Sequence, residues 1–164
     1  LPLIDKYDNL VVVRTFSKSR SMAGLRIGYA ISNPELIKAL NDVKYSYNSY
    51  TMNRPSLVLG VESIHDDAYF REKVGQIIAT RERFVKEIAE LGFTCLPSSA
   101  NFVFATHESI PAKEIFAAAK ENNIYVRYFD KPRIDNYLRI SIGTDAEMDT
   151  FVAFLKGYVE TKQN

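Results

Sequence analysis

Residues 9–31 have the sequence NLVVVRTFSKSRSMAGLRIGYAI, and this stretch gives the clearest indication of the fold. The apolar, β-branched residues 10–13 predict a strand that is buried on both faces in a parallel sheet. Residues 27–31 predict a second strand. The turn between these strands is rich in hydroxyls and cations and contains Lys18.

Lys18 has the properties of a nucleophile rather than of a core residue. Burying an ammonium group is costly, and the same desolvation favours the neutral amine, which attacks aldehydes. Thr15 and Ser17 place two hydroxyls before Lys18, and Arg26 follows the turn at residues 23–25. Hydroxyls, turn amides and arginine are groups that hold a phosphate. The pattern indicates a phosphorylated aldehyde cofactor, although a solvated basic turn would share it.

The segment from residue 9 to residue 29 closely resembles the lysine segment of fold-type-I aminotransferases. It is most similar to the histidinol-phosphate aminotransferase group. The resemblance implies that Lys18 binds pyridoxal 5'-phosphate covalently as a Schiff base. It also implies that Ser17, Thr15 and Arg26 hold the phosphate of this cofactor.

Three later segments carry the same resemblance. Residues 97–103 resemble the family's Ser-x-Ala-Asn-Phe strand, residues 124–127 its following strand, and residues 138–143 its carboxylate-binding strand. The resemblance implies that Arg139 binds the substrate α-carboxylate and that Arg127 helps to hold the remote phosphate of histidinol phosphate. An ordinary surface cation is the alternative for each arginine.

Alternation supports the assignment of Arg139 independently of the resemblance. Leu138, Ile140 and Ile142 point to one side of the predicted strand, so Arg139 and Ser141 point away from the core.

The resemblance is weaker at two places. Tyr47 and Asn48 resemble a Tyr-Asn pair near the family's active site and are candidate substrate-binding residues, but Ser46 stands where proline is common. Ser19-Arg20-Ser21 also departs from the smaller or more apolar residues that usually follow the lysine. Both departures leave the choice of substrate open.

The remaining pattern predicts helices and short strands. Asn33-Pro34 predicts a helix start, residues 46–53 a loop, and Pro55 the start of a shorter helix. Asp66 or Asp67 would cap a long helix that ends at Gly92. At about 1.5 Å per residue it would be roughly 35 Å long, enough to bridge two lobes. Further elements are expected as strands at 101–105, 124–127 and 137–143, a helix at 112–120, and a final helix that a capping box of Thr144 and Glu147 begins.

The fold class is therefore expected to be α/β, namely the C-terminal part of a fold-type-I pyridoxal-phosphate transferase. Residues 1–66 would be a remnant of the large cofactor-binding domain and its sheet. Residues 67–164 would form the long interdomain helix and a small C-terminal α+β domain.

Composition narrows the class of protein. The chain has 164 residues, is 46% hydrophobic and 25% charged, and has a net charge of +1. These values fit a soluble globular protein and favour neither nucleic acid nor a membrane as a partner. The single Cys95 and the separated His65 and His107 give no metal-binding spacing. No signal peptide or membrane span is visible, so we expect a cytoplasmic protein.

The resemblance implies transamination between histidinol phosphate and 2-oxoglutarate, with small amino and keto acids as substrates and a homodimer in the full-length parent. The chain is less than half of the family's usual length and lacks the aspartate that pairs with the pyridine nitrogen. We therefore expect it to be inactive alone.

Three alternatives to this function stay open. They are an aminotransferase of other aromatic or aliphatic amino acids, a phosphothreonine decarboxylase-like enzyme, and a non-catalytic α+β module for binding or dimerisation.

Overall fold

The structure is a computed structural model that describes residues 1–163. It contains two compact units, Leu1–Glu72 and a second unit that begins at Lys73. The division falls within the longest helix, α3 (Asp67–Ala89). The domain division predicted between residues 66 and 67 stays a prediction about the parent fold.

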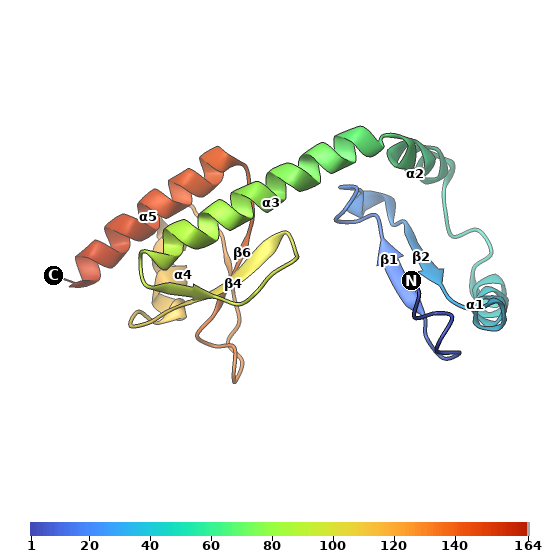
Figure 1. Cartoon of the computed structure of the whole chain (residues 1–164), viewed down its shortest axis with the longest axis horizontal. Helices are drawn as coiled ribbons and strands as arrows, with labels where there is room; N and C mark the ends of the chain where they lie inside the picture. Colours follow the sequence, from blue (N-terminus) through green and yellow to red (C-terminus); the bar gives the residue numbers. More distant parts are fainter. Residues whose placement is uncertain (164) are drawn as a thin grey trace. The chain divides into compact units, whose positions relative to one another are not determined.

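The first unit consists of a β-hairpin and two helices. Strand β1 (Val12–Thr15) pairs antiparallel with β2 (Gly28–Ile31), and a short 3-10 helix, η1 (Ala23–Leu25), lies in the connection. Helices α1 (Pro34–Tyr47) and α2 (Arg54–His65) follow in the chain (Figure 1).

The prediction of a buried strand in a parallel sheet is wrong for β1 in this chain. Among residues 1–163, β1 pairs only with β2, and the pairing is antiparallel. Val13 is 70% exposed because no described element covers its face of the hairpin. An apolar run indicates that a strand can be buried, but it does not identify the residues that bury it.

The predicted starts of α1 and α2 are confirmed, because asparagine side chains cap both helices. The side chain of Asn33 accepts a hydrogen bond from the Leu36 N–H at 2.9 Å, and Asn53 does the same for Ser56 at 2.8 Å. The prediction that a loop begins at residue 46 is wrong, since α1 continues to Tyr47. Ser46 is tolerated there because its hydroxyl donates to the carbonyl four residues earlier, at 2.7 Å.

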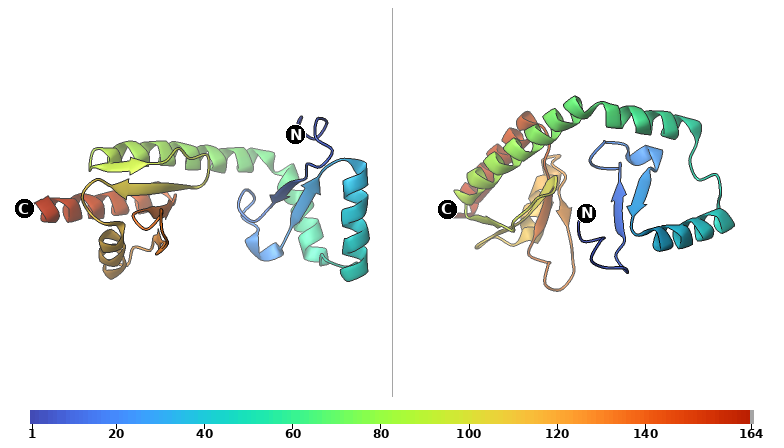
Figure 2. Two further views of the ribbon diagram at one scale, coloured as in Figure 1. Left: turned by 90° about the horizontal axis from the view of Figure 1, so that it is seen from below. Right: turned by 45° about the vertical axis from the view of Figure 1, so that its right-hand side comes forward.

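The second unit packs helices on an antiparallel sheet. Its strands are β3 (Phe93–Cys95), β4 (Phe102–His107), β5 (Arg127–Tyr128) and β6 (Leu138–Ser141), in the spatial order β3-β4-β6-β5. The helices are α4 (Ala112–Glu121), α5 (Asp145–Gln163) and the greater part of α3. Figure 2 shows α3 and α5 side by side.

One face of this sheet carries the core. Val103 of β4 lies opposite Ile140 of β6, and both are buried against the three helices. Helix α3 contributes Phe84 and Ile88, and the Phe84 ring stacks at 6.0 Å on Phe151 of α5. The predicted alternation of β6 is confirmed: Leu138 and Ile140 are buried, whereas Arg139 and Ser141 are exposed on the opposite face.

The predicted helix ends of the second unit are also confirmed. Gly92 follows α3 with φ of 85°, in the left-handed region. The capping box is formed, because the side chain of Glu147 accepts from the Thr144 N–H at 2.7 Å.

Two strands differ from the prediction. The strand expected at 124–127 is only Arg127–Tyr128, because Ile124 takes part in the turn that ends α4: its N–H donates to the carbonyl of Ala119 at 2.9 Å. Asn123, with φ of 59°, makes that turn possible. Strand β3 was not predicted, since three residues are too few to show a period.

Candidate functional site

Lys18 lies at the closed end of the β1–β2 hairpin. The last hydrogen bond between the two chain segments there runs from the Phe16 N–H to the Ile27 carbonyl, at 3.1 Å. Beyond it the chain turns tightly, since the N–H groups of Arg20 and Met22 both donate to the Phe16 carbonyl. Lys18 is exposed on this turn. The desolvation expected from the sequence is thus not supplied by the described residues.

The predicted phosphate ligands lie on the same hairpin end. Thr15 is the last residue of β1, and its hydroxyl oxygen accepts from the Ser17 N–H at 2.8 Å. Ser17 and Arg26 directly flank the final hydrogen-bonded pair, one on each segment. Arg26 adopts φ of 57° and donates to the Ala23 carbonyl at 3.0 Å. The hairpin therefore places an amine, two hydroxyls and a guanidinium at one end.

This hairpin end is strongly cationic. Residues 10–31 contain four cations and no carboxylate. One of them, Arg20, pairs with Asp67, but no ion pair within residues 1–163 involves Lys18 or Arg26. A phosphate dianion would be attracted to such a surface. This donor set fits the phosphate and the aldehyde of pyridoxal phosphate.

Arg26 also lines a cavity of about 480 Å³ between β2, α1 and the loop after it. Tyr29, Lys44 and Thr51 contribute polar groups to its wall. None of Lys18, Ser17 or Thr15 lines this cavity. Arg26 is thus the only predicted phosphate ligand there among the described residues.

Tyr47 and Asn48 lie at the end of α1. Tyr47 is the last helical residue, and its side chain is 92% exposed. The Asn48 N–H donates to the Lys44 carbonyl, and its side-chain oxygen accepts from the Tyr50 N–H at 3.1 Å. Asn48 therefore shapes the turn after α1, and its role in substrate binding stays a prediction.

Arg127 and Arg139 lie directly opposite each other on neighbouring strands. They form a register pair between β5 and β6, on the sheet face away from the core. The Phe129 ring lies beside both guanidinium groups, with its centroid 5.4 Å from Arg127 Cζ and 5.7 Å from Arg139 Cζ. Phe102 also contacts Arg139, at 5.5 Å. These arginines are in the second unit, whereas Lys18 is in the first.

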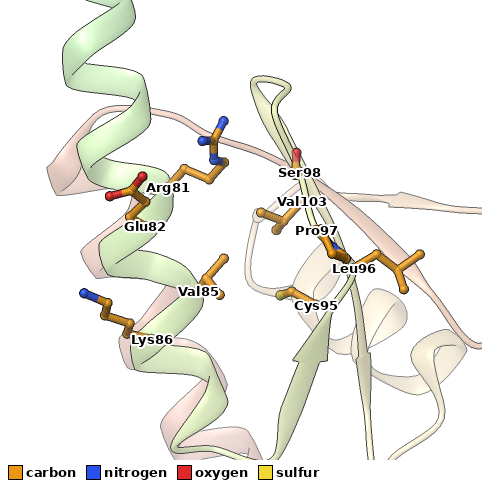
Figure 3. A pocket seen from close by; sticks show the side chains of 9 residues that line it. All are labelled: Arg81, Glu82, Val85, Lys86, Cys95, Leu96, Pro97, Ser98 and Val103. Carbon is orange, nitrogen blue, oxygen red and sulfur yellow. The ribbon is translucent and has the colours of Figure 1, made fainter.

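A separate cavity of about 380 Å³ lies between α3 and the β3–β4 hairpin and contains none of the predicted site residues. Figure 3 shows Arg81, Glu82 and Lys86 on the helix side and Cys95 on the strand side. Burial raises the pKa of the Cys95 thiol, which makes it a weaker nucleophile at neutral pH.

Sequence patterns did not assign roles to two residues that the structure connects to the candidate site. Phe129 lies beside both arginines, and Arg20 of the lysine turn donates a hydrogen bond to α2. Arg20 was visible only as an unusual residue after the lysine. Its contacts, with residues more than 40 positions away, give no local sequence pattern.

Comparison with known proteins agrees with this geometry. A family model described as aminotransferase class I and II matches residues 1–155. The histidinol-phosphate aminotransferase of Brachyspira hyodysenteriae is 51% identical over 154 residues, which cover 94% of this chain and 44% of that protein. The chain thus spans less than half the length of this relative.

Two solved structures share the fold. The histidinol-phosphate aminotransferase from Clostridium acetobutylicum superposes with a TM-score of 0.87 at 26% identity, over 98% of this chain and 48% of that one. The enzyme from Sinorhizobium meliloti, solved in complex with pyridoxal-5'-phosphate, gives 0.82 at 28% identity, over 98% and 45%. The predicted fold class is confirmed by these neighbours. The chain belongs to the class I and II aminotransferase family, whose members use pyridoxal phosphate.

Proposed function

We propose that this chain is part of a pyridoxal-phosphate-dependent aminotransferase that acts on histidinol phosphate and 2-oxoglutarate, in histidine biosynthesis. Relatives that are 51% and 48% identical to this chain are named histidinol-phosphate aminotransferase, which supports this substrate. The observation that carries the proposal is the pairing of Arg127 with Arg139. Like charges directly opposite each other destabilise a sheet, so this pair is best explained by anionic ligands.

The first unit would hold the cofactor. When bound, pyridoxal phosphate supplies an aldehyde for the substrate amine and a ring that accepts electrons from the substrate. Arg26, Ser17 and Thr15 would bind its phosphate. Lys18 would hold the aldehyde end of the cofactor, and once the substrate amine takes its place there, the Lys18 amine would be free to accept the proton from the substrate Cα.

The second unit would hold the substrates by their anionic groups. The planar guanidinium of Arg139 suits a bidentate carboxylate, as in 2-oxoglutarate and glutamate. Arg127 would bind the phosphate of histidinol phosphate. Fixing both ends of a substrate restricts its rotation, so that one proton is presented for transfer. Tyr47 and Asn48 are proposed as further substrate contacts.

The test uses a protein of the relatives' full length that contains this sequence. We expect Arg127→Met to lower kcat/KM for histidinol phosphate by about 10- to 150-fold, the loss of a charge-assisted hydrogen bond. The value for phenylalanine should fall much less, and Lys113→Met, on the exposed side of α4, should change neither. Equal losses for both substrates would overturn the assignment of Arg127.

The same protein distinguishes the alternative functions. A preference of the unaltered protein for phenylalanine would indicate an aromatic aminotransferase. Release of CO₂ from phosphothreonine would indicate a decarboxylase-like enzyme. Ligand binding that is unchanged in Lys18→Ala, with no turnover by the unaltered protein, would argue for the non-catalytic module.

Two further features of the parent belong to this proposal. We propose a homodimer, as is common in the family, and a cytoplasmic location, where amino-acid biosynthesis takes place. Among residues 1–163, no helix combines the length and the hydropathy that a membrane span requires. Sedimentation of the full-length protein would test the dimer.

A further inference from the structure

The Arg20 side chain is largely buried, unlike those of its neighbours in the lysine turn. Its neighbours Lys18, Ser19 and Ser21 are exposed, whereas the Arg20 side chain retains only 17% of its exposure. Burial of an arginine is costly unless its charge and its donors are satisfied. The contacts of Arg20 therefore indicate what this residue does in the first unit.

Three groups from other elements satisfy Arg20. Its guanidinium donates to the carbonyl of Ser63 at 2.6 Å, lies 3.8 Å from the carboxylate of Asp67, and stacks at 3.9 Å on the ring of Phe70. The Ser63 carbonyl is in the last turn of α2, where carbonyls lack helical partners and favour a cation. Asp67 and Phe70 begin α3.

Arg20 thus connects the lysine turn to the junction of α2 and α3. In Figure 1 the closed end of the hairpin lies next to this junction. Arg20 is two residues from Lys18, and the turn that contains both is closed by a hydrogen bond from the Ser21 N–H to the Lys18 carbonyl, at 3.1 Å. Contacts that hold Arg20 in place therefore also restrain the backbone of Lys18. Ser21 itself adopts φ of 55°, which a serine rarely adopts without support from its surroundings.

We propose that Arg20 is a positioning residue that holds the Lys18 turn against the junction of α2 and α3. It fixes the direction in which the Lys18 amine leaves the hairpin without touching the cofactor itself. The inference rests on the proposed function for its meaning, since a fixed amine matters only where that amine reacts. The contacts that carry it are independent of that function.

The chain offers a conservative variant and a matched control. Arg20→Lys keeps the charge but loses the planar guanidinium that both stacks on Phe70 and donates to Ser63. Arg20→Met keeps much of the side-chain volume and loses the charge. Arg71 also binds Asp67, but from the exposed surface of α3 and without contact to the turn. Arg71→Ala is therefore the control.

The first measurement is amide hydrogen exchange in the 164-residue chain without cofactor. We expect Arg20→Met to accelerate exchange at Ser21 and Met22 by about tenfold or more, as loss of a charge-assisted hydrogen bond implies. Arg20→Lys should lie between this variant and the unaltered chain. Exchange of the buried α3 amides near Phe84 should not change, which shows that the second unit remains folded. Unchanged exchange at Ser21 and Met22 in Arg20→Met would overturn the anchoring role.

The second measurement separates positioning from general stability. A protein of the relatives' full length that contains this sequence, and its Arg20 variants, are titrated with pyridoxal phosphate, trapped with borohydride and mapped by mass spectrometry. Arg20→Met should raise the concentration for half-maximal labelling of Lys18 several-fold and leave labelling of Lys38 unchanged. Arg20→Lys should restore part of the loss. Faster exchange with unaltered labelling of Lys18 would reject the positioning role, whereas absence of labelling at Lys18 in the unaltered full-length protein would reject the proposed function instead.

Discussion

Substitutions of His107 test which hydrogen bonds stabilise the second unit. The ring is 3% exposed at the end of β4 and lies edge-on to Phe93, at 4.8 Å between ring centres. Its Nδ1 accepts from the N–H groups of Ser109 and Ile110, at 3.1 and 3.0 Å. The hydrogen is therefore on Nε2, which donates to the Leu91 carbonyl at 2.9 Å. One side chain thus joins the turn after α3 to the turn before α4.

Replacement by phenylalanine keeps an aromatic ring at this position but removes all three hydrogen bonds. A buried polar group without a partner costs about 1–3 kcal/mol. Ile110 is buried, whereas Ser109 is exposed and its N–H can bind water instead. We therefore expect His107→Phe to lower the free energy of unfolding by about 2–4 kcal/mol. For a unit of this size the midpoint of thermal unfolding should fall by at least about 8 °C.

Two conservative variants show how much of this loss of stability comes from each ring nitrogen. Asparagine can place an oxygen near the position of Nδ1, and glutamine can place an amide nitrogen near that of Nε2. His107→Asn and His107→Gln should therefore both be more stable than His107→Phe in thermal unfolding followed by circular dichroism. A phenylalanine variant within about 0.5 kcal/mol of the unaltered chain would refute this reasoning, because such a change is typical of a surface position.

Two other predictions concern the same unit. Hydrogen bonds, first from Thr80 and next from Arg83, hold the pKa of Asp145 below its ordinary value. The ionised carboxylate therefore stabilises the fold above about pH 4, and this stabilisation is lost as the pH falls through the lowered pKa. Asp145→Asn should lower the urea midpoint at pH 7 and narrow the difference from the unaltered chain near pH 2; a constant difference would contradict this. Gly92→Ala should cost about 1–2 kcal/mol for the left-handed backbone, and more because its Cβ would lie 3.0 Å from His107 Nε2. Gly157→Ala, in open space on α5, should be neutral or stabilising by up to about 1 kcal/mol, and equal effects at both glycines in urea unfolding would contradict the account.

Features of the fold that depend on neighbouring residues were predictable from the sequence. The cap at Asn33, the capping box of Thr144 and Glu147 and the left-handed Gly92 each involve groups within a few positions. The exposed position of Arg139 follows from the two-residue period of a strand.

Features that depend on distant residues were not predictable in this way. Two properties of β1, its exposure and its antiparallel pairing with β2, depend on which other strands are present. The three-residue strand β3 is a strand only because β4 pairs with it. Arg20 looks like an ordinary surface cation until Ser63, Asp67 and Phe70 are brought to it by the fold.

The candidate site shows the same division. A lysine between hydroxyls and an arginine indicated the cofactor, and the hairpin places all four predicted contacts at one end. The register that sets Arg127 opposite Arg139 could not be obtained from either strand alone, because a register is a property of the pair.

The most direct test of the central claim is whether Lys18 is the residue that binds pyridoxal phosphate. A protein of the relatives' full length that contains this sequence, and its Lys18→Ala variant, are titrated with the cofactor, reduced with borohydride and mapped by mass spectrometry, with absorbance recorded before reduction. We predict one predominant adduct on Lys18, which the variant loses together with the absorbance band of the protonated Schiff base. Adducts spread over many lysines, and equal in both proteins, would contradict the assignment of the cofactor site to this hairpin.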